Sequence, residues 1–490
     1  MPKRSIGSKS RRNTKSFIHE LKLRPSKHAQ RKLNIKFNCL RELYNNVLGE
    51  CFKRLRQLRF DPLYAVAIDY YKSKEKEKGQ AILKELNIKY GLTKTKLQTL
   101  ATSIKNNTYM ADHLDGDTVQ VISDRAFDAF SDWMFKKGGR PRFKSWKNAL
   151  SSIQGKKNSC ILFKNGKVKW KDLKINVIYD KKDKHGIEAY ALNQRVKYCR
   201  LKRRFIKGQY HYYIQLVLEG VPKSKIKPPN KKVGIDIGVS TIAAISKNKA
   251  ILKPFCHNLE SIQQDIKIIQ RKMARSQRKN NPNNYNDDGT IKKGKKIWKN
   301  SNNYLKLQYQ LKELYRKQSD KRKMAHNLLV KEILLLGKKI HIEKNNYKAW
   351  QKGWFGKTIG FRAPSQFVST LKRKAESAGG TWEEINTFTT KLSQLCHVCD
   401  NYTKKPLSQR THQCCEITVQ RDLYSGLLAL YYNPTQQSVD TKSLRKDFRG
   451  YDQILNNAVS ALNKLQIRGI IPSSLGRLES REEQFAFKCS

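Results

Sequence analysis

The segment VGIDIGVSTIAAIS, residues 233–246, decides the fold of the central part of the chain. Its apolar residues predict a buried strand, a tight turn at Gly238 and a second strand that pairs with the first as a hairpin. Asp236 interrupts this apolar pattern. A buried carboxylate without a partner costs several kcal/mol, so Asp236 needs a cation or a hydrogen-bond network beside it. It is a candidate metal ligand, although a single Asp at a strand end is more often a turn or cap residue.

Two more acids occupy comparable positions farther along the chain. Glu343 ends the apolar segment IHIE (340–343), and Asp422 starts the segment DLYSGLLAL (422–430), whose leucines predict a helix. Taken alone, Glu343 suits a turn, and Asp422 suits a helix N-cap or a first-turn acid that complements the helix dipole. If the strands are neighbours, the three acids converge. Three convergent carboxylates are what two Mg²⁺ ions about 3.5–4 Å apart need to bridge a scissile phosphate.

The net charge of the chain indicates the class of its partner. The 490 residues include 101 Lys and Arg against 40 Asp and Glu, which gives a net charge of +61. Like charges weaken a compact state unless a polyanion offsets them, so the sequence predicts a nucleic-acid partner. The segment DIGVS (236–240) also resembles the phosphate loop of actin-like and sugar-kinase-like ATPases. That interpretation leaves the charge unexplained, and no second glycine-rich phosphate motif follows.

Length and hydropathy exclude several other classes of protein. A hydrophobic fraction of 38% is enough for packed cores, and the length predicts about three domains. The sequence contains no run of 18 apolar residues, so we expect no membrane span and no membrane partner. Residues 1–16 are basic and no apolar stretch follows them, so they do not resemble a secretory signal. We expect a cytoplasmic location.

Four of the ten cysteines lie within twenty residues of one another and predict a zinc site. Cys396 and Cys399 form a Cys-x-x-Cys knuckle, and a second pair of ligands follows after a loop of zinc-finger length. Cys415 is the clearest fourth ligand. The third is either His412 or Cys414, because adjacent cysteines rarely both bind one ion easily. Four protein ligands leave no open position for water, so the zinc would be structural.

Hydrophobic periodicity divides the rest of the chain. Pro25 ends an N-terminal strand, and Ser26 is suited to cap the first of several helices. Short alternating segments with turn pairs then predict a small antiparallel barrel or sheet, and two long helices follow between about 259 and 335. The Asn-rich segment 279–304 between those helices predicts a flexible loop.

The motifs GIDIG, IHIEKNN and KLSQLCHVCD…SQRTHQCCEITVQRDLYSGLLAL, in this order and spacing, resemble a known family. They are similar to the split RuvC-like nuclease domain with inserted zinc finger of the transposon-encoded TnpB (OrfB) proteins and the related miniature type V CRISPR effectors. Upstream, LKLRPSKHAQRKLNIKFNCLRELYNNVL and DRAFDAFSDWMFKKGGRPRFKS also resemble that family. The resemblance implies a multidomain α/β fold with an RNase H-like (RuvC) nuclease domain, an inserted zinc finger, a helical recognition lobe and a small antiparallel β-barrel wedge domain.

The resemblance also assigns roles to segments and residues. It implies a basic arm (1–16), a first wedge strand (17–26), a recognition lobe (27–135), a wedge domain (136–222), a nuclease domain (223–390 and 421–440), a zinc-finger insertion (391–420) and a C-terminal tail (441–490). The implied catalytic acids that hold Mg²⁺ are Asp236, Glu343 and Asp422. Arg410 falls where the family carries an arginine that steadies the scissile phosphate. The implied zinc ligands include Cys396, Cys399 and Cys415.

Besides a third zinc ligand that is either displaced or His412, two departures from the family pattern stand out. Glu416 replaces the glycine that usually follows the last cysteine, and Tyr424-Ser425-Gly426 stands where the family more often has Asn-Ala-Ala. Both lie in or beside the finger and put its geometry in question. Neither touches the three acids.

The expected function is RNA-guided DNA cleavage. The resemblance implies a guide RNA, double-stranded target DNA opened beside a short flanking motif, a guide–target heteroduplex and Mg²⁺-dependent cleavage, in a prokaryotic cytoplasm at the nucleoid. The alternatives are a nuclease-silent RNA-guided repressor, a transposase with the same fold and a ribosome-like RNA-binding protein. The sequence leaves open a transposon-borne or a CRISPR-associated origin, and one or two copies per guide RNA.

Overall fold

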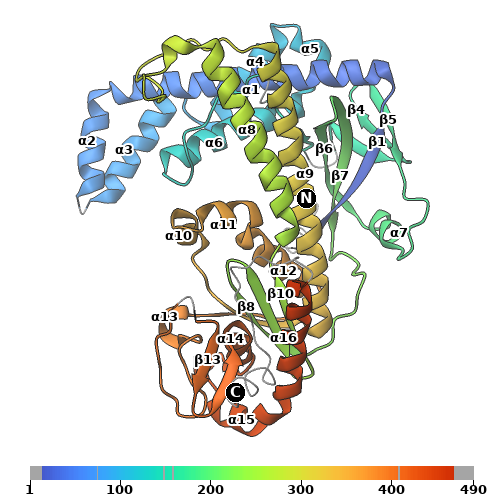
Figure 1. Ribbon diagram of the computed structural model, residues 1–490. Coiled ribbons are helices and arrows are strands. Elements are labelled where there is room, and N and C mark those ends of the chain that lie inside the picture. The colour runs from blue at the N-terminus through green and yellow to red at the C-terminus, as the bar shows by residue number, and fades with distance from the viewer. Residues whose placement is uncertain (1–13, 74, 147–148, 157–158, 407–408, 468–490) are drawn as a thin grey trace, which may run out of the picture. The chain divides into compact units, whose positions relative to one another are not determined.

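The computed structural model describes the chain except for residues 1–13, 74, 147–148, 157–158, 407–408 and 468–490 (Figure 1). Most of the predicted basic arm, and the end of the predicted tail, lie outside the described residues. The chain forms two compact units, Met1–Lys223 and Ser224–Ser490. No helix of the described residues is long and apolar enough to cross a membrane.

The first helix of the first unit begins where the sequence predicts. Strand β1 (Ser16–Arg24) stops before Pro25, and the Ser26 hydroxyl accepts a hydrogen bond from the Ala29 amide at 3.2 Å, which caps α1 (Lys27–Arg59). One face of α1 is buried against the other helices and the sheet of this unit. The remaining helices are α2 (Pro62–Lys72), α3 (Lys76–Lys89), α4 (Lys94–Asn106), α5 (Met110–His113), α6 (Gly116–Met134) and α7 (Ile187–Leu192).

An antiparallel sheet completes the first unit. The described residues form seven strands in the order β2-β6-β7-β1-β5-β4-β3. The N-terminal strand β1 lies between β7 and β5, so the first strand of the chain joins a sheet whose other strands follow residue 150. Those strands are β2 (Ser152–Gln154), β3 (Ile161–Lys164), β4 (Lys167–Trp170), β5 (Leu173–Ile178), β6 (Val196–Ile206) and β7 (Gln209–Glu219).

A mixed sheet forms the centre of the second unit. Its described strands have the order β10-β9-β8-β11-β12, in which β8, β11 and β12 are parallel and β9 and β10 are antiparallel neighbours. The strands are β8 (Lys232–Ile237), β9 (Thr241–Ser246), β10 (Lys249–Pro254), β11 (Lys339–Glu343) and β12 (Trp382–Ile385). The predicted hairpin of residues 233–246 is therefore β8 and β9.

The two faces of β8 carry different side chains. Val233, Ile235 and Ile237 pack into a core with residues of α9 (Asn302–Leu336) and α12 (Pro364–Ser377). Gly234 and Asp236 point to the opposite face, which α14 (Arg421–Leu430) covers. A Cβ atom on Gly234 would lie 2.1 Å from the Gly426 carbonyl oxygen and 2.3 Å from the Leu430 nitrogen, so only glycine permits this approach.

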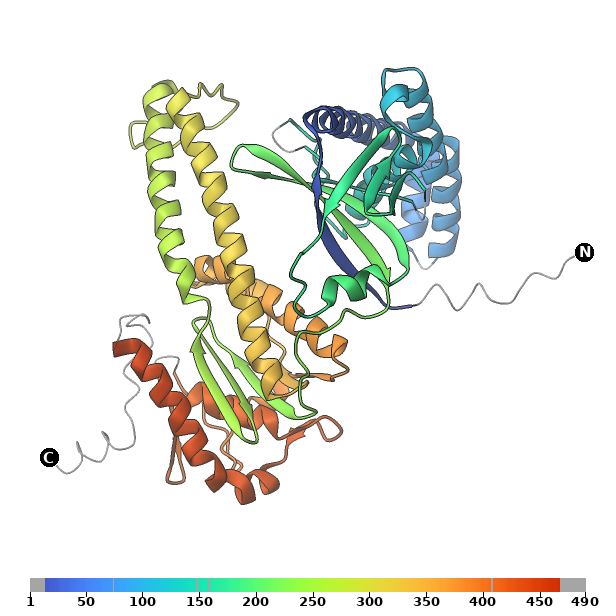
Figure 2. The ribbon, with the colours of Figure 1, turned by 90° about the vertical axis from the view of Figure 1, so that its right-hand side faces the viewer.

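Two long helices connect β10 to β11. Helix α8 (Glu260–Asn280) and α9 (Asn302–Leu336) form a hairpin whose far end extends away from the sheet (Figure 2). The loop between them differs from the predicted flexible segment. Asn281 exchanges hydrogen bonds with the backbone of Lys299 at 2.7 and 2.9 Å, and the Tyr285 and Trp298 rings pack edge to face. Asn side chains replace regular secondary structure here by bonding to backbone groups, which composition alone does not reveal.

The remaining elements of the second unit surround α14. Helix α16 packs on β10, so part of the segment after 440, which carries little sequence signal, belongs to the core. The elements are η3 (His257–Leu259), η4 (Pro282–Asn284), α10 (Tyr347–Lys352), α11 (Gly356–Arg362), α12 (Pro364–Ser377), α13 (Thr387–Thr390), β13 (Thr411–Cys414), β14 (Ile417–Gln420), β15 (Tyr432–Asn433), β16 (Ser438–Val439), α15 (Thr441–Asp447), η5 (Phe448–Tyr451) and α16 (Asp452–Ile467).

The close contact of β8 with α14 makes Gly234 intolerant of substitution. We expect Gly234→Ala to lower the free energy of unfolding by about 3 kcal/mol, because the added methyl group overlaps backbone atoms that cannot rotate away. Urea denaturation measures the change. Gly116→Ala is the control, since a Cβ there meets nothing within 4 Å. Equal stability of the two variants would contradict the contact.

Candidate functional site

Strand register brings Asp236 and Glu343 together. In the parallel pair of β8 and β11, Ile235 lies opposite Ile342, so the next residues, Asp236 and Glu343, end adjacent strands side by side. Parallel partners in register point to the same face of a sheet. The two carboxylates therefore share the face that α14 covers.

Helix α14 adds the third carboxylate. Residues 422, 426 and 430 lie on one face of a helix, and Gly426 and Leu430 meet β8 at Gly234. Asp422 is one turn closer to the helix start and therefore comes near Asp236. It is buried, and the Thr241 hydroxyl donates a hydrogen bond to its Oδ2 atom at 2.6 Å. The helix cap is the Gln420 side chain, which accepts from the Leu423 amide, so Asp422 is not the N-cap.

Burial and mutual repulsion disfavour negative charge on these acids. Burial, followed by the charges of Glu343 and Asp422, raises the pKa of Asp236 well above its usual range. Burial also raises the pKa of Glu343 to about 7, although the Arg421 guanidinium opposes the shift. A site in which carboxylates resist ionisation is one that a divalent cation stabilises.

The donor set fits magnesium. Carboxylate oxygens are the ligands that Mg²⁺ prefers, and the ion is usually held by one or two carboxylates together with water and substrate phosphate. Asp236, Glu343 and Asp422 supply such oxygens at one sheet edge. Among the described residues, the Arg421 guanidinium and the Thr241 hydroxyl stabilise negative charge on these acids.

Arg410 and Arg421 are joined through the backbone at the start of α14. The Arg421 amide donates to the Arg410 carbonyl oxygen at 2.8 Å, which continues the pairing of β13 with β14. The Arg421 guanidinium also donates to the Pro406 carbonyl oxygen at 3.0 Å. Arg410 is half-buried beside this junction. Sequence reasoning missed Arg421, although its position next to Asp422 was a usable signal.

Arg362 supports the turn that follows Asp236. Its side chain is buried, and its two terminal nitrogens donate to the Val239 carbonyl oxygen and to Glu260 Oε1, both at 2.7 Å. These bonds tie the turn to α8. The sequence carries no pattern that would single out this arginine among so many.

Tyr347 lies against the acids from α10. Its hydroxyl is buried, and burial, with contributions from the charges of Asp236 and Glu343, raises the pKa of Tyr347 to about 12. The phenol therefore stays protonated and can donate a hydrogen bond. Sequence reasoning did not identify this residue.

The four clustered cysteines meet beside α14. The sulfur atoms of Cys396, Cys399, Cys414 and Cys415 all lie within 4.8 Å of one another. The backbone amide of Asn401 is the main cause that lowers the pKa of Cys399 to about 7, which favours the thiolate that metals bind. A group of four sulfur donors fits a structural zinc ion.

The structure separates the two candidates for the third ligand. Cys414 Sγ lies 3.6 Å from Cys415 Sγ and 3.7 Å from Cys399 Sγ, so adjacent cysteines do meet in one cluster. Positive φ angles at Cys415 (48°) and Glu416 (64°) turn the chain sharply enough for this, and both lie in the left-handed region that glycine favours. His412 instead stacks on Tyr424 with ring centroids 4.1 Å apart, and its Nδ1 contacts Lys405 Nζ at 2.8 Å.

Cys414 and His412 can be compared by zinc content. We expect Cys414→Ser to lose most of the roughly one zinc ion per chain, because it removes a sulfur donor from a four-ligand site. We expect His412→Gln to keep its zinc. Plasma mass spectrometry of the purified variants measures both. Retention by the cysteine variant and loss by the histidine variant would contradict the assignment.

The buried acids also predict a pH dependence of stability in magnesium-free buffer. The folded pKa of Glu343, about 7, lies above its ordinary value of 4.5, and that of Asp236 is raised too. The folded chain then binds more protons than the unfolded chain, so the stability present below about pH 4.5 is lost as the pH rises to 7.

Removing one of these charges should offset that loss. We expect Asp236→Asn to raise the unfolding free energy at pH 8 by on the order of 1–3 kcal/mol, and to have little effect at pH 5. Thermal unfolding of the zinc-loaded protein measures the difference, with the exposed Asp265→Asn as the control. A lower stability of the Asp236 variant at pH 8 would show that the carboxylate is already well paired.

Part of the chain is similar to proteins of known structure and family. Residues 365–426 match the family model described as Cas12f1-like, TNB domain. No curated protein sequence matches the chain. A solved structure, the cryo-EM structure of the Cas12f1-sgRNA-target DNA complex, is 12% identical, covers 86% of this chain and 100% of its own, and has a TM-score of 0.45. A cryo-EM structure of a CRISPR-Cas12f ternary complex is 13% identical, covers 84% and 86%, and has a TM-score of 0.28.

The matched segment holds the cysteine cluster, Arg410 and Asp422, which are three of the features that the sequence motifs singled out. The chain is a multidomain α/β protein, and the match over residues 365–426 confirms its relationship to the TnpB and miniature type V effector family.

Proposed function

We propose that the chain is an RNA-guided DNA endonuclease that cuts with a single carboxylate site. The observation that carries this proposal is the convergence of Asp236, Glu343 and Asp422 from two parallel strands and one helix. Acidic residues are scarce in this chain of net charge +61, so three that meet at one end of the central sheet are not there to balance surface charge. They are needed to hold cations against a phosphodiester.

The topology of the second unit supports an RNase H-like, RuvC-type nuclease domain. Its sheet joins a hairpin of antiparallel strands to two parallel strands. The acids near the ends of β8 and β11 and the acid on the covering helix α14 all lie at one end of these strands. In this proposal 223–390 and 421–440 form the nuclease domain and 391–420 the zinc-bearing insertion. The antiparallel sheet of 136–222 with β1 is the wedge, and 27–135 is the recognition lobe.

The residues have separate tasks in the proposed reaction. Asp236, Glu343 and Asp422 would hold Mg²⁺, which when bound supplies an activated water and stabilises the leaving 3′ oxygen. Thr241 fixes the orientation of Asp422 through its 2.6 Å hydrogen bond. Arg421 limits the repulsion among the acids. Arg410, whose backbone pairs with that of Arg421 next to Asp422, would contact the scissile phosphate.

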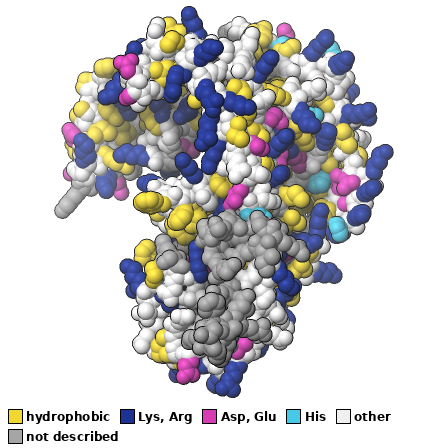
Figure 3. Space-filling model, in the orientation of Figure 1, with side chains coloured by type: hydrophobic (Ala, Val, Ile, Leu, Met, Phe, Trp, Pro, Cys, Tyr) yellow, Lys and Arg dark blue, Asp and Glu magenta, His cyan; other side chains and the backbone are white. Residues whose placement is uncertain are grey.

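The charge of the whole chain supports the nucleic-acid partners. Lysine and arginine far outnumber acidic residues, and Figure 3 shows their side chains spread over the face in view. A spread of cations suits recognition of a nucleic-acid backbone, in which base pairing between guide and target reads the sequence. The proposed partners are a guide RNA, double-stranded DNA and the guide–target heteroduplex.

Loss of a single acid separates cutting from binding. We expect Asp236→Ala to abolish Mg²⁺-dependent cleavage of a target, a decrease of at least a hundredfold, while RNA-guided DNA binding persists. Cleavage and gel-shift assays on the complex that co-purifies with its RNA measure the two properties. Asp265→Ala, an exposed acid on α8 of the same unit, is the matched control.

Three other results would reject parts of the proposal. Normal cutting by Asp236→Ala would reject the site. Target binding without cutting in the wild type would indicate a nuclease-silent repressor, and strand-transfer products would indicate a transposase.

A further inference from the structure

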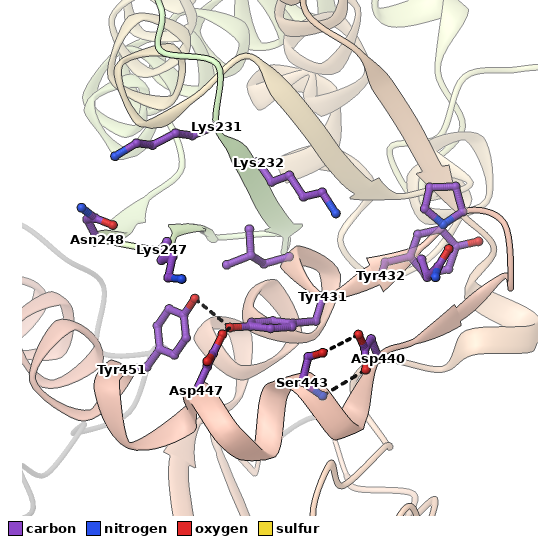
Figure 4. A pocket seen from close by; sticks show the side chains of 13 residues that line it. Lys231, Lys232, Lys247, Asn248, Tyr431, Tyr432, Asp440, Ser443, Asp447 and Tyr451 are labelled. Carbon is purple, nitrogen blue, oxygen red and sulfur yellow. Dashed lines mark hydrogen bonds between the residues drawn. The ribbon is translucent and has the colours of Figure 1, made fainter.

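A pocket lies at the other end of strand β8 from the three acids. A hollow of about 580 Å³ opens where β8 begins (Figure 4). Lys232 lines it, and Asp236 lies four residues farther along the strand, which places the acids about 13 Å away. Its volume falls within the roughly 300–1,000 Å³ of small-ligand pockets. The proposed cleavage reaction makes no use of it.

One wall of the hollow is basic. Lys231, Lys232 and Lys247 line it together with the amide of Asn248 in the turn between β9 and β10. In Figure 4 the three lysines lie on the side of the hollow that faces Tyr431. Among the described residues, none of these ammonium groups has an ion-pair partner within 4.0 Å. Three unpaired cations around one space repel one another and favour an anion between them.

The acids on the other wall are already engaged. Asp440 accepts hydrogen bonds from the Ser443 amide at 3.0 Å and hydroxyl at 2.6 Å, and Asp447 accepts from the Tyr431 hydroxyl at 2.6 Å. Both carboxylates keep their negative charge, and Asp440 interacts electrostatically with Lys232, but the lining holds two acids against three lysines. They leave the three lysines with an excess of positive charge.

Two tyrosines on that wall offer fixed aromatic surfaces. The Tyr431 hydroxyl bonds to Asp447 and lies 3.2 Å from the Tyr451 hydroxyl, and the two rings meet at 80° with centroids 6.2 Å apart. Tyr431 is half-buried, and its ring lies between the lysines and Asp447 (Figure 4). A held aromatic ring is a platform for a nucleic-acid base, and base stacking contributes about 1–3 kcal/mol.

We propose that this hollow binds one nucleotide of a single-stranded segment of RNA, with its phosphate among Lys231, Lys232 and Lys247 and its base against Tyr431. Lysines alone would also suit an acidic peptide, but every nucleotide carries a flat ring next to its charge, whereas an acidic residue of a peptide does not. RNA is preferred to DNA because the excess charge of the chain requires a polyanion that stays bound. This choice rests on the proposed function, in which the guide RNA is the permanent partner.

Photo-cross-linking tests the site directly. The full chain is purified, stripped of nucleic acid and irradiated with a mixed-sequence RNA 12-mer, and mass spectrometry locates the cross-linked peptides. We expect a cross-link at Tyr431. A triple variant, Lys231→Gln with Lys232→Gln and Lys247→Gln, should reduce this cross-link at least fivefold. It should also lower the salt dependence of RNA binding by about two ionic contacts. Lys292→Gln, Lys293→Gln and Lys295→Gln, a matched triple change on an exposed loop of the same unit, should leave this cross-link unchanged.

Other outcomes would overturn the proposal or part of it. No cross-link at Tyr431, or an equal cross-link in both triple variants, rejects the site. Equal cross-linking of a DNA 12-mer rejects the choice of RNA, and binding of uridine monophosphate at least as tight as that of the 12-mer shows that a free nucleotide is the ligand. Tyr431→Leu should weaken binding of the RNA 12-mer at least fivefold if the base stacks on the ring. A cross-link at Tyr431 in a chain that never cleaves DNA would keep the RNA site and reject the endonuclease.

Discussion

The backbone contact between β8 and α14 is the constraint on which the second unit depends. Gly234 has no side chain, so the helix lies directly on the strand at Gly426 and Leu430. One turn earlier, the same helix face carries Asp422 to the level of Asp236. A larger residue at 234 would lift the helix and move one acid away from the other two. The chemistry of the site thus depends on the absence of a side chain two residues before the first acid.

The site also shows how buried charge is managed in a very basic protein. Three acids meet here, Asp422 buried and the other two half-buried, and among the described residues Arg421 provides a guanidinium and Thr241 a hydrogen-bonded hydroxyl. The Tyr347 hydroxyl also lies beside the acids, but this support is incomplete, since the pKa values of Asp236 and Glu343 stay raised. A fully paired set would be more stable and would bind a metal ion less well. The remaining repulsion is what a divalent cation would relieve.

Much of this arrangement could be predicted from the sequence. Asp236, Glu343 and Asp422 stood out because each interrupts or borders an apolar segment, and the spacing of the cysteines indicated a metal cluster. The choice between His412 and Cys414 could not be predicted, because it depends on left-handed backbone at positions 415 and 416. Arg362 and Arg421 were hidden among 101 basic residues, since only their contacts distinguish them. The Asn-rich loop was misread because side-chain bonds to the backbone leave no periodic pattern.

The central claim is that three carboxylates from separate parts of the chain form one cation site. Anomalous diffraction from crystals grown with Mn²⁺ tests it most directly, because manganese substitutes for magnesium at oxygen ligands and gives a distinctive signal. The account predicts anomalous density enclosed by Asp236, Glu343 and Asp422. Full occupancy elsewhere, with no density between these side chains, would contradict it.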